Sequence, residues 1–395
     1  MTTESAVARP PLTLLSEDEE AFRDAVAGFA TEEVKPRVAA MERAGKIDPE
    51  LIAKYFAMGL MGIEVPEQYG GAAGSLFMVA LAVEEVSKID AAAAILIDVQ
   101  NTLVNYPIAR YGSEALKAKY LPRLTSDTIG AYALSEPGSG SDAFGMATRA
   151  EQKGDAWVLN GRKMWITNGA EGSCFALLVK TAPDAQPRYQ GMSLFIAPKM
   201  EGFTVGRKLD KLGYKSIDTV EMIFENYRVP ADHLIGGVEG RGFAQTTGGL
   251  ELGRINVAAR GVGIAEGALK LAADYSQTRQ TFGKPICEHQ AIQLKLGEMA
   301  TRARAARLLT LDAAAIFDRG ERCDMEAGMA KYFSSEAALE NAIEGMRIHG
   351  AYGYSKEYDI ERLYRDAPLT CIGEGTNEMQ RIIIAKQLIK RNPAA

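Results

Sequence analysis

The sequence predicts an α+β fold in three parts, with an all-α N-terminal domain, a central antiparallel β domain and a C-terminal helical bundle. The chain has 395 residues, more than one core of about 100 to 200 residues accommodates. Apolar residues recur at helical spacing toward both ends of the chain, whereas its middle holds short runs rich in valine, isoleucine, threonine and aromatic residues. The expected order is therefore helices, then strands, then helices.

The N-terminal helical domain is expected over residues 1–128. Ser16 and Glu19 have the spacing of a capping box, which marks the start of the first helix. Helical spacing continues over 49–61, 75–108 and 114–124.

The β domain is expected over residues 129–240 and the bundle over 241–395. Turn signals at Lys153-Gly154-Asp155, Asn160-Gly161 and Asn168-Gly169 separate the β-prone runs and are typical of hairpins in a small barrel or sandwich. Helical spacing then returns over 255–278, 286–317, 325–349 and 377–390.

The composition argues against several classes of protein. A net charge of -6 gives no general attraction to nucleic acid or to anionic lipid. The most apolar span, 91–104, is interrupted by Asp98, Gln100 and Asn101 and is shorter than the roughly 20 residues that cross a bilayer. The N-terminus lacks the charged and apolar regions of a signal peptide. We expect a cytoplasmic protein that binds neither nucleic acid nor membrane.

The few histidines and cysteines limit the chemistry. Three histidines and four cysteines lie scattered, without metal-ligand spacing, so we expect no metal site. Acid-base chemistry should then fall to carboxylates or tyrosines.

Four stretches can carry chemistry, and each also has a purely structural interpretation. The polar loop YALSEPGSGSDAFG, 132–145, can face a phosphate or a flavin edge, or can simply be exposed to solvent. Trp165 in KMWITNG can present an aromatic face or pack in the core. Arg279, at a predicted helix end, can hold a pyrophosphate or remain a solvated cation. Glu374, between two glycines in CIGEGTNEMQ, can meet a ligand closely or merely favour a helix N-terminus.

Taken together, five stretches in their order and spacing resemble the acyl-CoA dehydrogenase family over essentially the whole chain. They are YALSEPGSGSD, NGRKMWITNG, RQTFGKPICEHQAIQ, HGAYGYSKEYDIERLYRDA and IGEGTNEMQ. The resemblance implies a C-terminal four-helix bundle, FAD bound between the domains, and a homotetramer.

The resemblance also implies a reaction. In that family a carboxylate removes the α-proton of an acyl-CoA while the β-hydrogen leaves as hydride to flavin N5, giving a trans-2-enoyl-CoA. Glu374 matches the position of this base. The α C–H bond becomes acidic enough when hydrogen bonds polarise the thioester carbonyl, which the family achieves with the base's own amide and a ribityl hydroxyl of FAD. Desolvation makes the carboxylate a stronger base.

The binding residues are carried over position by position. On the β-domain side the implied FAD contacts are Tyr132, Leu134, Ser135, Gly140, Ser141, Trp165, Ile166 and Thr167. Further implied FAD positions, reaching the cofactor mainly from a neighbouring subunit, are Arg279, Phe282, Gln290, Arg347, Ile348, His349, Gly350 and Ala351. The capping turn beside the cofactor holds Thr376, Asn377 and Glu378. The implied acyl-CoA contacts are Ser141, Phe243, Glu251, Arg254 and Gly375.

Three positions distinguish this chain within the family. Some members carry their catalytic acid at the position of Gly253, where glycine cannot act, so this chain resembles the majority type. Arg347 and Ala351 stand where the common pattern has glutamine and glycine, so the FAD contacts of this segment are less defined than the cofactor itself.

The substrate class follows from a more limited resemblance. DVQNTLVN, LSEPGSGSDAF and MAKYFSSEAA are most similar to the short/branched-chain members, which implies a 2-methyl-branched or short acyl-CoA and electron-transfer flavoprotein as acceptor. Two alternatives are an acyl-CoA oxidase on the same scaffold, which would consume oxygen, and a flavin-binding relative that no longer dehydrogenates.

Overall fold

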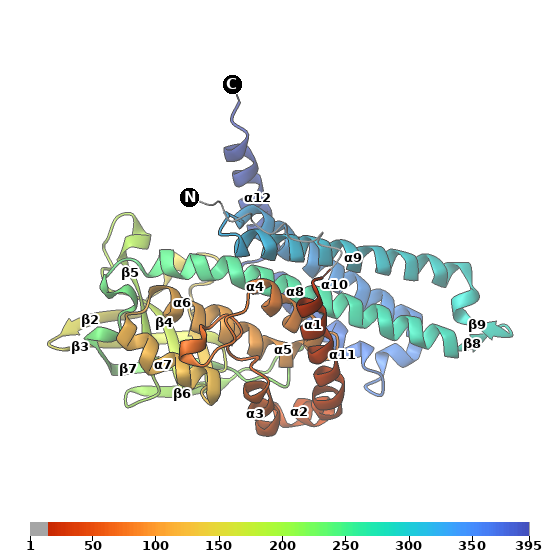
Figure 1. The fold of residues 1–395 in the computed structure, drawn as a ribbon, viewed down its shortest axis with the longest axis horizontal. Helices are drawn as coiled ribbons and strands as arrows, with labels where there is room; N and C mark the ends of the chain where they lie inside the picture. The colour runs from red at the N-terminus through yellow and green to blue at the C-terminus, as the bar shows by residue number, and fades with distance from the viewer. Residues whose placement is uncertain (1–14, 395) are drawn as a thin grey trace.

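The computed structural model describes residues 15–394 and has the three-part order expected from the sequence (Figure 1). The N-terminal stretch in which we expect no signal peptide lies largely outside this range. The strands of the seven-stranded sheet gather at one end of the molecule, and the long helices α8 (Gly242–Thr278), α9 (Gln290–Asp318) and α10 (Asp324–His349) run side by side away from them. The predicted fold class is confirmed, whereas the exact domain boundaries stay a prediction.

The N-terminal part is helical throughout, with more breaks than the sequence suggests. The capping box of Ser16 and Glu19 is present at the start of the first helix. The single helical stretch expected over 75–108 is divided, because the Asp90 carboxylate accepts the amides of Ala92 and Ala93 and starts a new helix. The helical elements are α1 (Glu17–Phe29), η1 (Ala30–Val34), η2 (Lys35–Arg37), α2 (Val38–Ala44), α3 (Pro49–Ala57), η3 (Glu67–Tyr69), α4 (Leu76–Ser87), α5 (Ala91–Asp98), η4 (Val99–Asn105), α6 (Tyr106–Tyr111) and α7 (Glu114–Ser126).

Seven strands of the described range form one sheet in the order β1-β4-β2-β3-β7-β6, with β5 paired to β4. They are β1 (Gly130–Ala133), β2 (Arg149–Lys153), β3 (Ala156–Thr167), β4 (Cys174–Lys180), β5 (Met192–Pro198), β6 (Phe203–Lys208) and β7 (Thr219–Pro230).

Two details of the expected β domain are wrong. The sheet is not wholly antiparallel, because the chain passes through the β2–β3 hairpin before β4 pairs with β1 in the parallel direction. Asn160-Gly161 is not a turn: β3 continues through it, and the register against β7 shifts there instead. Gly161, with φ +150°, serves as a bulge in a long strand.

The C-terminal helices largely follow the expected periods. The hairpin of β8 (Gln280–Thr281) and β9 (Lys284–Pro285) joins α8 to α9, and α11 (Ile360–Ile372) and α12 (Asn377–Arg391) follow α10. The sequence did not predict α11. It also placed the start of α8 too late, at residue 255, because residues 242–253 contain several glycines, and glycine disfavours helices. Tertiary packing overrides that preference: a Cβ on Gly242 would lie 2.5 Å from the Ser193 carbonyl carbon.

No described helix combines the length and apolar character needed to cross a bilayer. Within the same range, no three histidine, cysteine or acidic side chains gather as a metal site would require.

Candidate active site

Glu374 lies in a strained turn between α11 and α12. Its φ is +54° and that of Gly375 is +88°, so both residues adopt the left-handed conformation, which is unfavourable for a glutamate. The Gln380 side-chain amide donates to the carbonyl oxygens of Glu374 and Gly375 at 3.2 and 3.0 Å. The first turns of α12 thus hold the backbone of Glu374 in place.

Asn377 attaches this turn to α10. Its side-chain oxygen accepts from Lys331 Nζ at 2.9 Å and from Ser335 Oγ at 3.0 Å, and its Nδ2 donates to Glu336 at 2.8 Å. Thr376 caps α12 by accepting from the Met379 amide. Because the Asn377 side chain is occupied by these bonds, its expected role beside the cofactor is that of an anchor.

The carboxylate of Glu374 points at α8. A Cβ on Gly253 would lie 3.0 Å from Glu374 Oε2 and 3.5 Å from Leu103 Cδ2 of η4. The predicted base and the position at which the resemblance implies an acid in other members are therefore neighbours in space, and the glycine leaves room for the carboxylate.

Charges and burial set the proton affinity of Glu374. Burial first, and then the negative charge of Asp98, raise the pKa of Glu374 to about 7 against the opposing effect of Arg260, Arg254 and Lys331. A carboxylate with a pKa near neutrality suits a general base.

Gly253→Ala should separate stability from activity. Alanine in a helix interior favours folding by up to about 1 kcal/mol relative to glycine, but its Cβ would displace the Glu374 carboxylate. We expect an unchanged or higher melting temperature together with a kcat lowered about 10-fold or more. Calorimetry and steady-state kinetics on the same preparation test this, and full activity would show that the close contact is unimportant.

The predicted flavin-side residues of the β domain lie on one loop and one strand. Met164 N donates to Ser135 O at 2.8 Å, and Lys163 Nζ donates to Leu134 O at 3.0 Å, so β3 holds the loop that follows β1. Gly140 and Ser141 are exposed on that loop. Trp165, with φ +65°, lies where the register shifts and is 61% exposed. An indole so exposed is a surface for a planar ligand.

Ile166 differs from its neighbours. Its side chain is buried in the core of the β domain, so only its backbone can meet a cofactor. Thr167 is half-buried at the end of β3.

Buried hydroxyls beside Glu374 fit a polar ligand. The Tyr132 hydroxyl of β1 and the Thr246 hydroxyl of α8 are buried and interact with each other, but neither makes a hydrogen bond of normal geometry within the described residues. Buried polar atoms are normally satisfied, so this pair favours a hydrogen-bonding molecule between the β domain and α8. Together with the exposed Trp165, it agrees with a bound FAD.

The predicted acyl-CoA residues continue along α8. Phe243 packs against Phe144 of the Ser141 loop, with ring centroids 4.7 Å apart. Farther along, Glu251 and Arg254 interact electrostatically, and Arg254 Nε is buried without a hydrogen-bond partner in the described range. Gly375 follows Glu374 in the strained turn.

The remaining predicted residues gather at the other end of α8. Arg279 lies 26 residues beyond Gly253, which is about 39 Å along a helix. Its guanidinium stands 5.7 Å from the Tyr352 ring centroid, and His349 stacks on Tyr275 at 4.3 Å. Phe282, at the hairpin tip, is 97% exposed. Within one chain these residues cannot reach Glu374, which is compatible with the predicted contact to a neighbouring subunit.

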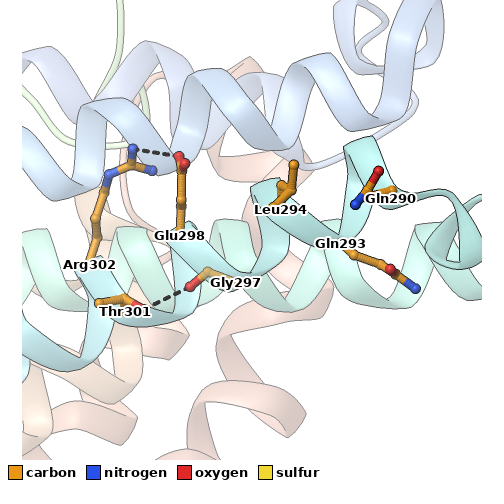
Figure 2. A pocket seen from close by; sticks show the side chains of 7 residues that line it. All are labelled: Gln290, Gln293, Leu294, Gly297, Glu298, Thr301 and Arg302. Atoms are coloured by element: carbon orange, nitrogen blue, oxygen red, sulfur yellow. Dashed lines mark hydrogen bonds and ion pairs between the residues drawn. The ribbon is translucent and has the colours of Figure 1, made fainter.

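The Arg347–Ala351 segment belongs to this second group. Arg347 is exposed and pairs with Glu344, Ile348 is buried, Gly350 has a positive φ, and Ala351 is exposed. Gln290 begins α9 and borders a hollow of about 690 Å³ on the outer face of that helix (Figure 2). Figure 2 shows the Arg302–Glu298 pair at the far end of the same hollow.

Sequence reasoning missed four buried residues around Glu374: Asp98, Arg260, Lys331 and Gln380. The one available signal was polarity inside apolar helices. Asp98 interrupts the run AAAAILID, but only the fold shows which carboxylate it approaches.

Comparison with known proteins supports the same family. Models of the acyl-CoA dehydrogenase N-terminal, middle and C-terminal domains match residues 16–128, 131–227 and 240–389. An acyl-CoA dehydrogenase of Bacillus subtilis (strain 168) is 46% identical over 377 residues, covering 95% of this chain and 99% of that protein.

Two further relatives are similar over nearly their whole length. A mitochondrial short/branched chain specific acyl-CoA dehydrogenase of Rattus norvegicus is 37% identical over 387 residues, 98% of this chain and 89% of the other. The solved butyryl-CoA dehydrogenase of Megasphaera elsdenii superimposes with a TM-score of 0.92 at 37% identity, covering 95% and 99% of the two chains. The chain belongs to the acyl-CoA dehydrogenase family and is an FAD-dependent oxidoreductase that acts as an acyl-CoA dehydrogenase.

Proposed function

We propose that the protein converts a short or 2-methyl-branched acyl-CoA into the trans-2-enoyl-CoA, with Glu374 as the catalytic base. The placement of Glu374 carries this proposal. Glu374 is half-buried and held in a strained turn, its carboxylate lies against Gly253, and its surroundings raise its pKa. A carboxylate in that position can remove an α-proton without competition from water.

The chain's own groups prepare the substrate. The backbone amide of Glu374 is assigned to the thioester oxygen, where it lowers the energy of the developing enolate. The Glu374 carboxylate takes the α-proton, and the electrons of that bond form the double bond as the β C–H bond breaks. FAD, when bound, supplies the acceptor for the β-hydride.

The remaining roles are assigned by position. Tyr132, Leu134, Ser135, Gly140, Ser141 and Trp165–Thr167 are proposed to hold the flavin, with Thr376–Glu378 beside it. Phe243, Glu251, Arg254, Ser141 and Gly375 are proposed to line the CoA channel. Arg279, Phe282, Gln290 and Arg347–Ala351 are proposed to reach the FAD of a second copy within a homotetramer.

A short acyl group suits the surroundings of the base. Leu103 stands beside Glu374 and Gly253, and the buried charges of Asp98 and Arg260 act on the same carboxylate. The similarity to the short/branched chain specific and butyryl-CoA dehydrogenases supports a short acyl group. The tolerance of an α-methyl branch is inferred from the similarity to the short/branched chain specific relative.

The electron acceptor and location follow the family pattern. We propose electron-transfer flavoprotein as acceptor and a cytoplasmic location, with no nucleic-acid partner. Oxygen consumption during turnover would favour an oxidase instead.

Anaerobic titration with 2-methylbutyryl-CoA tests the proposal. Bleaching of the oxidised-flavin band would support both acyl-CoA oxidation and tolerance of an α-methyl group. A flavin that bleaches with butyryl-CoA but not with 2-methylbutyryl-CoA would overturn the branched preference alone. No bleaching with any short acyl-CoA would overturn the proposed substrate class.

The pH dependence of kcat/KM should report Glu374. Because burial raises its pKa to about 7, the base is ionised above that pH and protonated below it. We expect kcat/KM to rise with pH and level off above about 7, with a loss of about tenfold per pH unit on the acid side. If kcat/KM instead fell only near pH 4.5, this acid limb of the pH profile would contradict the buried environment.

A further inference from the structure

A buried ion pair joins the N-terminal domain to the bundle near Glu374. Asp98, the last residue of α5, pairs with Arg260 of α8, with Oδ2 and Nε 3.2 Å apart. Both side chains are almost completely buried, at 3% and 5% exposed. Thr102 donates to Asp98 Oδ1 at 3.0 Å, and Arg260 Nη1 donates to the Tyr214 hydroxyl at 3.4 Å.

The pair lies on the surfaces that face the base. Arg260 is seven residues beyond Gly253, two helical turns along the same face of α8. Gly253 is the residue of that face that meets the Glu374 carboxylate. Opposite it, Leu103 of η4 reaches the same point, and η4 directly continues α5, which Asp98 ends. Asp98 and Arg260 are also the two charges that act most strongly on Glu374.

The other titratable groups around Glu374 come from five elements. Arg254 of α8 and Lys331 of α10 are further cations, and Tyr132 of β1 faces the carboxylate. Cys371 of α11 and Glu378 of α12 act on Lys331 rather than on Glu374. Asp98 is the one anion among the strongest influences on Glu374, and Arg260 is its direct partner.

Stability alone does not explain this pair. Removing two charges from water costs several kcal/mol each, and apolar replacements of a buried ion pair are often equally stable. We infer that Asp98 and Arg260 are positioning residues that set the pH range in which Glu374 works, and that they act on it with opposite signs. This inference rests on the proposed role of Glu374 as the base.

Opposite signs give a sharp test. In Asp98→Asn the anion is lost and the Arg260 charge is left unbalanced, so Glu374 should ionise at lower pH. In Arg260→Gln the cation is lost, while the hydrogen bond of Thr102 to the Asp98 side chain and the interaction of Asn256 with it remain. Glu374 should then ionise at higher pH. We expect the acid limb of kcat/KM to move down in the first variant and up in the second, by about one pH unit or more each.

Two further variants and a second readout isolate the electrostatic effect. Arg260→Lys keeps the charge and should retain the wild-type limb, and the Asp98→Asn/Arg260→Gln double variant should return close to it. The infrared band of the protonated Glu374 carboxyl, identified by its loss in Glu374→Gln, should titrate with the same shifts in resting holoenzyme. If the ion pair only held the two domains together, the acid limb of kcat/KM would shift in the same direction in both single variants.

Arg307→Gln serves as a matched control. Arg307 of α9 pairs with buried Glu84 of α4 at 2.7 Å and likewise joins the bundle to the N-terminal domain. The Arg307→Gln variant should lower the melting temperature without shifting the acid limb of kcat/KM. If Glu374→Gln is inactive but the two limbs do not move apart, this inference is wrong while the base assignment stands. If Glu374→Gln remains active, the proposed function itself fails.

Discussion

Glu374→Gln should lower kcat by about 10⁴-fold, which is the upper range for removal of a general base. Glutamine has nearly the shape of glutamate but cannot accept the α-proton at neutral pH. The turn should survive, because Gln380 and Asn377 hold it through groups other than the Glu374 carboxylate. Rapid mixing of the holoenzyme with acyl-CoA, followed by flavin absorbance, measures the effect directly.

Binding measurements show whether the loss is chemical. The variant should retain FAD through gel filtration and should bind acyl-CoA with near wild-type affinity. Near-normal bleaching would remove Glu374 from the catalytic role, whereas loss of FAD would show that the substitution had damaged the site as a whole.

Glu136→Ala should destabilise the protein by about 3 to 5 kcal/mol, the usual range for breaking a buried ion pair from one side. Glu136 Oε1 lies 2.8 Å from Lys163 Nζ, and the two side chains are 5% and 0% exposed. Burial already lowers the pKa of Lys163 to about 8. The same carboxylate accepts the amides of Ala147 and Thr148, so alanine would leave these two amides without an acceptor and Lys163 without its counter-charge.

The damage should extend to the cofactor side. Lys163 also donates to Leu134 O, so the pair holds the loop proposed to cradle the flavin. Urea unfolding and FAD retention measure the two effects. Glu151→Ala, in an exposed pair with Lys153 on β2, should change stability by less than about 1 kcal/mol. A Glu136→Leu/Lys163→Met double variant should recover stability. Similar losses of stability in Glu136→Ala, Glu151→Ala and the double variant would contradict the role of the Glu136–Lys163 pair.

Local sequence signals predicted the elements whose causes are local. The capping box at Ser16 and the turn at Gly154 depend on nearby residues, and both formed as expected. The Asn160-Gly161 signal failed because β7 pairs on both sides of it and keeps β3 continuous. The prediction also missed the early start of α8, for a related reason. The glycines there allow close approach to other segments and do not mark a loop.

The candidate site shows the same division. Glu374 was identifiable from its motif, because the turn that holds it is encoded in consecutive residues. Asp98 and Arg260 are 162 positions apart and approach the base only through the packing of α5 on α8. No local pattern reports which charges will surround a carboxylate in the folded chain, and these charges set its proton affinity.

The length of α8 also bears on inheritance of defects in an assembled enzyme. One continuous helix carries Gly253 near one end and Arg279 at the other. In the proposed tetramer, a chain with a damaged hairpin would keep its own base intact and impair the cofactor of its neighbour. Each damaged chain would then disable one site on its neighbour, so hairpin variants and Glu374 variants would both lose activity in proportion to their share of the chains. Mixing the two kinds of inactive chain would instead restore some sites, because a hairpin-damaged chain keeps its own base and can receive an intact hairpin from a Glu374-variant neighbour.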